Sequence, residues 1–389
     1  MPDTAVPERV AEFVRTRVVP REPVLDAGGP PAAAALRELR DDAVGRGLWA
    51  LPLPAELGGG GLGLAEYAAY AEVEGASDHG PAALGSAALL DVRMLARHAS
   101  VGVRDRWLKP VVAGEARTCY AMTEPDVPGT DPFLTATRAL REPDGRWRVT
   151  GRKWFTSGAV DADLVTVLAR TDGGDGDRDG LSLFLVPTDT PGFRVVRELP
   201  MLGAGGQWEI ELDGVLVAED HLVGGRGEAL DVAGERLQWG RTLRCLRWLG
   251  QAQRAFDLMC GRAVSRSGSR GPLAGHQLVQ RHVFEALLAL RTTRPLVHEA
   301  VALLDAGRDA RMEVGLAKVA AARMLQQVAD AAIQVHGAAG LGPDTALPAL
   351  FRTGRAARIL DGPDEVHITA VARRVLRGYG GEGAAATQW

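Results

Sequence analysis

Apolar residues recur at three- and four-residue steps over roughly the first 118 residues, and joints rich in Gly or Pro separate the periodic segments. This period is that of amphipathic helices, which bury one face and expose the other. The segments with this pattern are 11–19, 34–44, 65–76 and 87–99, and Trp107 and Leu108 close a further amphipathic turn before Gly114. The pattern predicts an N-terminal helical domain over residues 1–118.

From residue 119 to about 223 the apolar positions alternate instead, which is typical of strands. The segments 134–140 and 146–155 flank the turn Glu142-Pro143-Asp144-Gly145, a strong hairpin signal. Three further β-rich runs follow at 164–170, 181–187 and 208–217. Because no helices alternate with these strands, the pattern argues against a parallel Rossmann sheet, and residues 119–223 are predicted to form a middle, antiparallel, barrel-like β domain.

The helical period returns after about residue 224 and continues nearly to the end of the chain. The segments 243–264, 277–306 and 314–337 are long enough for bundle helices, and a shorter segment, 364–377, precedes a Gly- and Ala-rich tail that we expect to be disordered. Residues 224–389 are therefore predicted to form a C-terminal helical bundle, and residues 172–180 a surface turn. The fold class is α+β with several domains.

Composition narrows the function. The chain has 389 residues and a formal net charge of −4, which gives no electrostatic reason to expect nucleic acid or an anionic membrane as a partner. No apolar run reaches the roughly 18–20 residues of a membrane span, and the N-terminus has no signal-peptide pattern. Three scattered cysteines, Cys119, Cys245 and Cys260, favour a reducing, cytoplasmic location and argue against a metal or disulfide framework.

One apparent motif is misleading. Gly58, Gly60 and Gly63 satisfy the spacing of a dinucleotide-binding loop, but the preceding segment contains Pro52 and Pro54 and is no strand. Without a strand before it and a helix after it the motif has no meaning, so a joint between helices is predicted. Patterns of zinc proteases, serine hydrolases and P-loop ATPases are absent from the sequence.

Five other segments are specific as a set. They are Tyr120-Ala121-Met122-Thr123-Glu124-Pro125 with Gly129-Thr130-Asp131, Gly151 to Gly158, Arg241 at the opening of a long helix, Gln334-Val335-His336-Gly337, and Asp361-Gly362-Pro363-Asp364-Glu365-Val366-His367. In this order and spacing the chain resembles the acyl-CoA dehydrogenase superfamily from about residue 8 to 377. The T-E-P-D-V and D-G-P-D-E-V-H variants are most similar to a subgroup whose animal members act on hydroxylated or unusual acyl chains.

The resemblance implies a helical domain, a β-barrel domain and a C-terminal four-helix bundle, with FAD between the domains and the chains paired into homodimers or homotetramers. It also implies α,β-dehydrogenation of an acyl thioester, on CoA or on an acyl-carrier protein, to the 2,3-enoyl thioester. The electrons would pass to an electron-transfer flavoprotein or to oxygen. Such a reaction needs a base for the α-proton, a hydride acceptor and donors for the thioester oxygen.

Asp361 occupies the position of the catalytic Glu of many members, and the similar subgroup also has Asp there. Patterning alone favours a plainer interpretation, in which Asp361 to Glu365 form a helix start with Pro in the first turn and acidic residues at the positive end of the dipole. Some relatives instead carry the base at the position of Gly240, which has no side chain. The resemblance therefore implies that Asp361 is the base.

The resemblance also implies residues that bind substrate and cofactor. Arg241 and Thr130 match substrate-contacting positions, although an Arg on a helix is more often solvated and a Thr also suits a strand edge. The flavin-cradling positions are matched by Tyr120, Met122, Thr123, Gly129, Thr130, Trp154 and Thr156, with Pro363 and Glu365. The positions that hold the adenine half and the pyrophosphate across a subunit interface are matched by Arg266, His276, Gln277, Gln334, Gly337 and Ala338.

Two departures from the family pattern leave alternatives open. The family has Phe at the position of Ser269 and a second Gly at the position of Ala338, so loss of packing could weaken FAD binding. One alternative is a flavin-dependent monooxygenase that hydroxylates amines, but such relatives generally lack the carboxylate base. The other is a structural paralogue that binds no flavin.

Overall fold

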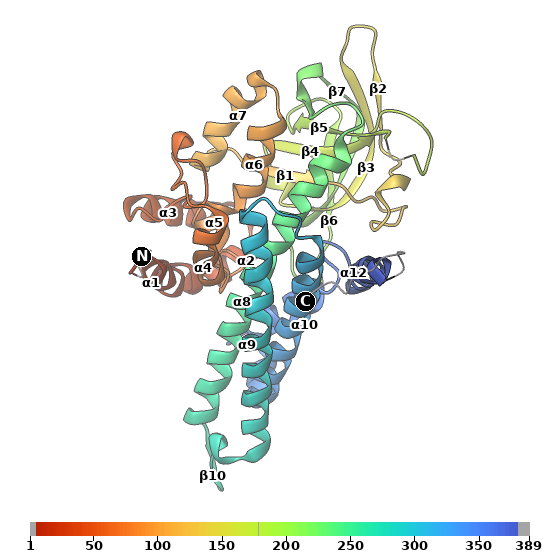
Figure 1. Ribbon diagram of the computed structural model, residues 1–389. Coiled ribbons are helices and arrows are strands. Elements are labelled where there is room, and N and C mark those ends of the chain that lie inside the picture. Colours follow the sequence, from red (N-terminus) through yellow and green to blue (C-terminus); the bar gives the residue numbers. More distant parts are fainter. Residues whose placement is uncertain (1–4, 178, 380–389) are drawn as a thin grey trace. The chain divides into compact units, whose positions relative to one another are not determined.

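A computed structural model describes residues 5–177 and 179–379 (Figure 1). Contacts gather the chain into two compact units. Unit 1 comprises residues 1–23, 63–81 and 238–389, and unit 2 comprises residues 24–62 and 82–237. The predicted division at residues 118 and 223 stays a prediction, and the tail from residue 380 onward lies outside the described residues.

Unit 2 combines helices from the first third of the chain with the β domain. Its helices are α3 (Gly29–Gly45), α6 (Leu89–His98) and α7 (Val101–Ala113), and the short helices α2 (Glu22–Ala27) and α5 (Gly80–Ala83) lie where the chain passes between units. Ser100 caps α7 by accepting a hydrogen bond from the Val103 amide at 3.2 Å, and Gly114 ends it with a φ of 72°. The turn predicted at Trp107 and Leu108 is therefore part of a longer helix.

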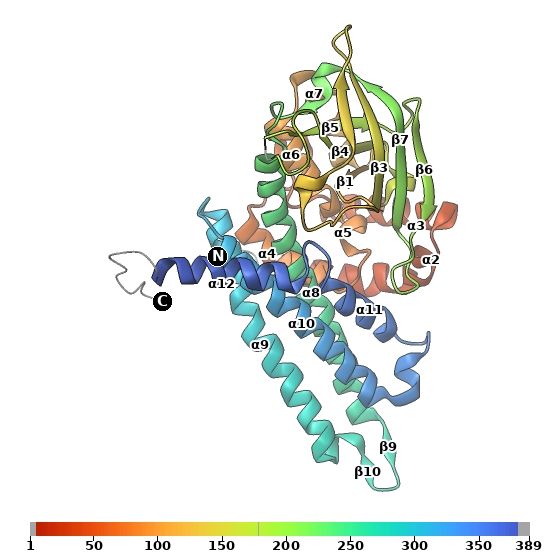
Figure 2. The ribbon, with the colours of Figure 1, turned by 90° about the vertical axis from the view of Figure 1, so that its right-hand side faces the viewer.

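The strands of unit 2 form one curved sheet in the order β6-β7-β3-β2-β4-β5-β8, with β1 paired to β4 (Figure 2). Their bounds are β1 (Thr118–Ala121), β2 (Arg138–Arg141), β3 (Trp147–Ser157), β4 (Leu164–Arg170), β5 (Leu181–Pro187), β6 (Phe193–Glu198), β7 (Gln207–Val217) and β8 (Leu222–Val223). Most pairs are antiparallel, as predicted, but β1 runs parallel to β4, and β2 and β4 share one parallel bridge. The predicted antiparallel sheet therefore holds for most of the pairs, and the parallel pairs at β4 are an addition that the sequence pattern did not predict.

The predicted hairpin is confirmed as β2 and β3, which pair from Arg138 opposite Thr150 to Arg141 opposite Trp147. Trp147, Val149 and Phe184 point into the core between the sheet faces, and the rings of Trp147 and Phe184 lie 5.3 Å apart. The first strand of this hairpin, β2, was predicted from residue 134 but begins at Arg138. The amides of Ala136 and Thr137 donate to the Glu124 carboxylate instead of to a neighbouring strand.

Unit 1 is built from long helices. They are α1 (Ala5–Phe13), α4 (Leu64–Glu74), α9 (Gln277–Asp305), α10 (Arg311–His336), α11 (Leu347–Ala357) and α12 (Asp364–Tyr379), together with residues 238–265 of α8 (Ala229–Ser265). A small hairpin of β9 (Ser267–Gly268) and β10 (Gly271–Pro272) joins α8 to α9. Figures 1 and 2 both show α8, α9 and α10 side by side, and α12 crosses α10. Among the described residues no helix is both long and apolar enough to cross a membrane.

Glycines permit close backbone packing in two segments, α11 and the loop before α4. The sequence pattern gave no prediction for α11, whose Gly354 packs so closely on α10 that a Cβ there would lie 2.8 Å from the Cα of Gln326. The glycine-rich segment before α4 is a loop, as predicted. Cβ atoms at Gly59 and Gly60 would lie 2.3 Å and 2.7 Å from the carbonyl oxygens of Leu53 and Leu51, so these glycines serve packing of the loop.

Candidate active site

Asp361 lies in the short loop between α11 and α12 in unit 1. α12 begins at Asp364, so Asp361 is outside the helix and the helix-start interpretation applies only to Asp364 and Glu365. Asp361 and Gly362 both have left-handed backbones, with φ of 55° and 99°. For a residue with a Cβ such a conformation costs about 1–3 kcal/mol and persists only where surrounding contacts impose it.

Three side chains impose this conformation by bonding to the loop backbone. Arg241 Nε donates to the Asp361 carbonyl at 2.9 Å, and Lys318 Nζ donates to the Gly362 carbonyl at 2.6 Å. His367 Nε2 lies 3.2 Å from the same Asp361 carbonyl. The sequence predicted that Arg241 opens a long helix. This prediction is wrong, because α8 begins at Ala229 and Arg241 lies in its interior.

The carboxylate of Asp361 faces Arg244, a cation that was not among the predicted site residues. Arg244 Nε lies 2.5 Å from Asp361 Oδ2, while Oδ2 itself is buried and accepts no aligned hydrogen bond. The contact is therefore an ion pair without hydrogen-bond geometry. A signal for Arg244 was present in the sequence, because it follows Arg241 by three residues and helical residues three apart share a face.

A buried polar network supports the loop from below. Lys318 and Asp364 are both fully buried, and Lys318 Nζ lies 3.9 Å from Asp364 Oδ1. Asp364 Oδ2 also accepts a hydrogen bond from Arg358 Nε at 2.9 Å. Burial lowers the pKa of Lys318, although the charges of Asp364 and Asp361 oppose this. Burial, followed by the charges of Arg241 and Lys318, lowers the pKa of His367 to about 4. His367 is therefore a neutral imidazole near neutral pH.

The second group of predicted site residues lies in unit 2, where β1 leads into a loop beside β3. The Trp154 amide donates to the Thr123 carbonyl at 3.0 Å, and the Thr123 hydroxyl donates to the Trp154 carbonyl at 2.8 Å. Beneath them Lys153 Nζ donates to Glu124 Oε1 at 2.7 Å and to the Met122 carbonyl at 3.0 Å. These bonds join the loop to the strand along three consecutive residues.

A bulge in β3 decides which way its side chains point. The pairing of β3 with β7 shifts register between Lys153 and Thr156, and Phe155 has a left-handed φ of 49°. The bulge breaks the in–out alternation of the strand, so Phe155 is 43% exposed and Thr156 is fully buried. Thr156 Oγ1 has no hydrogen-bond partner. A buried hydroxyl without a partner is costly and needs an explanation.

Tyr120, on β1, has the same feature. Its hydroxyl is buried without a partner, and burial raises its pKa to about 12 although Arg236 opposes the shift. The Arg236 guanidinium lies 4.1 Å from the centre of the Tyr120 ring and donates to Asp91 at 2.7 Å. One face of the Tyr120 ring therefore packs against a cation.

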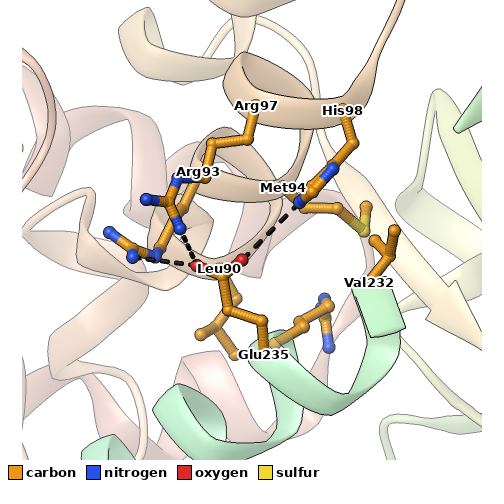
Figure 3. Close-up of a pocket in the computed structure, with 8 residues that line it drawn as sticks. Leu90, Arg93, Met94, Arg97, His98, Val232 and Glu235 are labelled. Atoms are coloured by element: carbon orange, nitrogen blue, oxygen red, sulfur yellow. Dashed lines mark hydrogen bonds and ion pairs between the residues drawn. The ribbon is translucent and has the colours of Figure 1, made fainter. Parts of the chain in front are cut away.

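The cavity beside Arg236 is lined by α6 and the first part of α8 (Figure 3). Arg93, Arg97 and His98 converge there on the carboxylate of Glu235. The cavity measures only about 10 Å³, which is room for about one water molecule. It therefore cannot hold a substrate in this state, and its ion pairs serve to join α6 to α8.

The remaining residues predicted to contact the flavin lie in the loop between β1 and β2 and at the start of α12. Gly129 and Thr130 are exposed, and a Cβ at Gly129 would lie 3.0 Å from the Thr123 methyl group. Pro363 and Glu365 flank Asp364 at the start of α12, Glu365 being exposed. Among residues 5–177 and 179–379 there is no group of three His, Cys, Asp or Glu side chains that could hold a metal ion.

The residues predicted to hold the adenine half lie in two groups in unit 1. Arg266, His276 and Gln277 surround the β9–β10 hairpin, with His276 immediately before α9. Gln334 is in the last turn of α10, and Gly337 ends that helix with a φ of 65°. Ala338 follows and is exposed. Within the described part of the chain no hydrogen bond or ion pair joins the two groups.

Comparisons with known proteins agree over nearly the whole chain. The family models for the acyl-CoA dehydrogenase N-terminal, middle and C-terminal domains match residues 3–115, 119–215 and 227–376. A Mycobacterium tuberculosis protein named "Probable acyl-CoA dehydrogenase FadE2" is 37% identical over 95% of this chain and 94% of its own length. Acyl-CoA dehydrogenase family member 11 of mouse is 32% identical over 95% of this chain, which spans 50% of that longer protein.

Solved structures give the same result for the fold. A Mycobacterium abscessus protein assigned as an acyl-CoA dehydrogenase superposes with a TM-score of 0.90 at 34% identity, covering 98% of this chain and 100% of that one. Butyryl-CoA dehydrogenase from Megasphaera elsdenii superposes with a TM-score of 0.86 at 21% identity, covering 97% of this chain and 100% of its own. The α+β fold of helical, β and helical parts is therefore confirmed. The chain belongs to the acyl-CoA dehydrogenase family of oxidoreductases.

Proposed function

We propose that this protein is a flavin-dependent dehydrogenase in which Asp361 removes the α-proton of an acyl thioester to give the 2,3-enoyl thioester. The observation that carries the proposal is the Asp361 loop. The carboxylate-bearing residue has a strained left-handed backbone, which Arg241, Lys318 and His367 hold in place. Strain maintained by several contacts is typical of catalytic positions.

The residues of the β domain fit a flavin. Thr156 and Tyr120 each present a buried hydroxyl that lacks a partner, and the polar edge and phosphates of FAD offer acceptors and donors for such groups. The partly exposed Trp154 provides an apolar surface beside them. In this proposal FAD is held by Tyr120, Met122, Thr123, Gly129, Thr130, Trp154 and Thr156, with Pro363 and Glu365. When bound, it supplies a two-electron acceptor for the β-hydride.

Asp361 does the acid–base work of the reaction. Its carboxylate accepts the α-proton while the electron pair of that C–H bond forms the Cα–Cβ double bond. Arg241 fixes the backbone carbonyl of Asp361 and thereby the direction of the Asp361 carboxylate. This matters because the Asp side chain is shorter than that of Glu and has less freedom to compensate for a displaced backbone. Arg241 and Thr130 are proposed to contact the substrate, with the Arg241 charge favouring negative charge on the thioester oxygen.

The adenine half and pyrophosphate are proposed to lie against Arg266, His276 and Gln277 of one chain and Gln334, Gly337 and Ala338 of another. The exposed apolar residues of α9 support a homodimer or homotetramer, since Leu278, Phe284 and Leu288 are 74%, 65% and 50% exposed. Ser269 is exposed at the tip of the β9–β10 hairpin, where an aromatic ring would have offered more packing surface. We therefore expect weaker FAD binding than with Phe at that position.

The experiment that tests the function is anaerobic mixing of the yellow protein with a panel of acyl-CoA and acyl-carrier-protein thioesters while the flavin absorbance is followed. Rapid bleaching identifies both the activity and the preferred acyl group. An electron-transfer flavoprotein or oxygen is then added to find which one restores the colour. A colourless protein that takes up no added FAD would contradict the proposal and favour a structural role. If only NADPH reduces the flavin, and the reduced protein then hydroxylates an amine with oxygen, the monooxygenase alternative is favoured.

A further inference from the structure

Two arginines of α8 bind different parts of the same residue. Arg241 Nε donates to the main-chain carbonyl of Asp361, whereas Arg244 Nε contacts its carboxylate at 2.5 Å. They are three residues apart on one helix and therefore point in a similar direction. The backbone and the carboxylate of Asp361 are thus held separately, by neighbouring side chains of one rigid element.

The contact with Arg244 leaves the carboxylate able to react. Asp361 Oδ2 is buried, yet it accepts no aligned hydrogen bond, so its lone pairs are not occupied by a donor. The guanidinium nevertheless contributes a positive charge at ion-pair distance. Such a charge attracts the carboxylate and favours the rotamer that faces the guanidinium.

The other charged and titratable groups around Asp361 come from three helices. Arg241 and Cys245 are on α8, Lys318 is on α10, and Asp364 and His367 are on α12. Burial raises the pKa of Cys245 to about 12, so that thiol stays neutral, and His367 is neutral above its pKa of about 4. Asp364 is balanced by Lys318, Arg323 and Arg358. Arg244 is therefore the cation nearest to the Asp361 carboxylate itself.

We propose that Arg244 is a positioning residue for the catalytic base, fixing the rotamer of the Asp361 carboxylate until substrate binds. This inference rests on the proposed role of Asp361. It assigns to Arg244 a function in proton abstraction that acts through Asp361 alone. Arg244 is 41% exposed, so its replacement disturbs little of the buried packing.

The test is the rate of flavin reduction by the acyl-CoA that bleaches the wild-type flavin fastest, measured over a range of acyl-CoA concentrations. In Arg244→Gln the carboxylate samples other rotamers, so the limiting reduction rate falls about tenfold. The acyl-CoA concentration that gives half of this rate and the flavin content both stay unchanged, because Arg244 is proposed to act through Asp361 alone.

Two further variants separate charge from structure. Arg244→Lys keeps the cation, so its limiting rate recovers towards that of the wild type. Arg291→Gln, an exposed residue of α9, loses the same charge elsewhere and keeps the wild-type rate. A wild-type limiting rate in Arg244→Gln overturns the inference, as does an equal loss of rate in Arg244→Lys. If Arg244→Gln fails to retain flavin, Arg244→Met is measured in its place, and the same two outcomes overturn the inference.

Failure of the proposed function would look different. Asp361→Asn tests that function without involving Arg244, because it removes the base and leaves the guanidinium. Unchanged bleaching in Asp361→Asn would contradict the role of Asp361 itself. Lost bleaching in Asp361→Asn combined with a wild-type reduction rate in Arg244→Gln would retain the dehydrogenase and reject only the role of Arg244.

Discussion

Glu124 and Lys153 form an ion pair beneath the loop that carries Met122 and Thr123, with Oε1 and Nζ 2.7 Å apart and both side chains buried. Burial raises the pKa of Glu124, but the charge and hydrogen bond of Lys153, aided by Thr137, outweigh it and lower the pKa overall. Burial also lowers the pKa of Lys153 to about 8, against the attraction of Glu124. The pair persists because Glu124 receives three further hydrogen bonds from Ala136 and Thr137.

We expect Glu124→Gln to be strongly destabilising, because it leaves Lys153 charged and buried without its counterion. Breaking a buried pair from one side costs about 3–5 kcal/mol. The double variant Glu124→Gln, Lys153→Met removes the orphaned charge and should recover much of this loss. Urea denaturation of the four proteins in the cycle measures the coupling. Additive losses from the two single changes would show that the pair contributes nothing as a unit.

Asp361→Asn should retain fold and flavin but lose reduction of the flavin by thioester. The amide is nearly isosteric and cannot accept the α-proton, and removal of a general base costs roughly 10²–10⁴-fold in rate. Anaerobic stopped-flow spectroscopy measures the bleaching rate directly. Bleaching at the wild-type rate would mean that Asp361 only shapes the loop before α12.

Thr156→Val should weaken flavin binding without weakening the flavin-free protein. The buried hydroxyl has no partner in the protein, so its replacement by a methyl group of similar size is neutral or stabilising for the fold. Loss of one hydrogen bond to the flavin should weaken its affinity about fivefold to tenfold. Flavin titration and thermal denaturation of the flavin-free protein give the two quantities. Equal flavin affinity in both proteins would mean that Thr156 does not face the cofactor.

His367 should make the protein less stable in mild acid. Its pKa is about 4 in the fold and 6.5 when unperturbed, so between these values the unfolded chain binds a proton that the folded chain does not. Stability therefore falls as the pH decreases from 6.5 towards 4, by roughly 3 kcal/mol in total. His367→Gln should flatten this part of the profile. The measurement is denaturant unfolding at a series of pH values, and parallel profiles for the two proteins would contradict the assignment.

Assembly and flavin content should change together. If Arg266, His276 and Gln277 hold the adenine half of a flavin bound mainly by another chain, dilution that separates the subunits should release flavin. Arg266→Ala should weaken cofactor binding although Arg266 is exposed and remote in sequence from the β-domain cradle. Light scattering with absorbance over a dilution series measures molar mass and occupancy together. A monomer with full flavin occupancy would exclude the shared site.

The sequence alone determined the succession of helical, β and helical parts, because hydrophobic periodicity records which face of each element is buried. It also made Asp361, Thr156 and Tyr120 candidate site residues, through the resemblance of short motifs to a known family. The hairpin at Glu142 and the loop at Gly58 followed from local turn chemistry, which depends on neighbouring residues only.

The tertiary structure decided what depends on residues distant in sequence. The three-residue spacing places Arg244 on the same helix face as Arg241, but its contact with the Asp361 carboxylate forms only when α8 and the loop before α12 pack together. The left-handed bulge at Phe155, which turns Thr156 inward, depends on how β3 pairs with β7. The late start of β2 has the same kind of cause, since the Glu124 carboxylate takes up the amides of Ala136 and Thr137 that a longer strand would have used. Periodicity describes an element by itself, whereas these features arise from competition between elements for the same hydrogen bonds and charges.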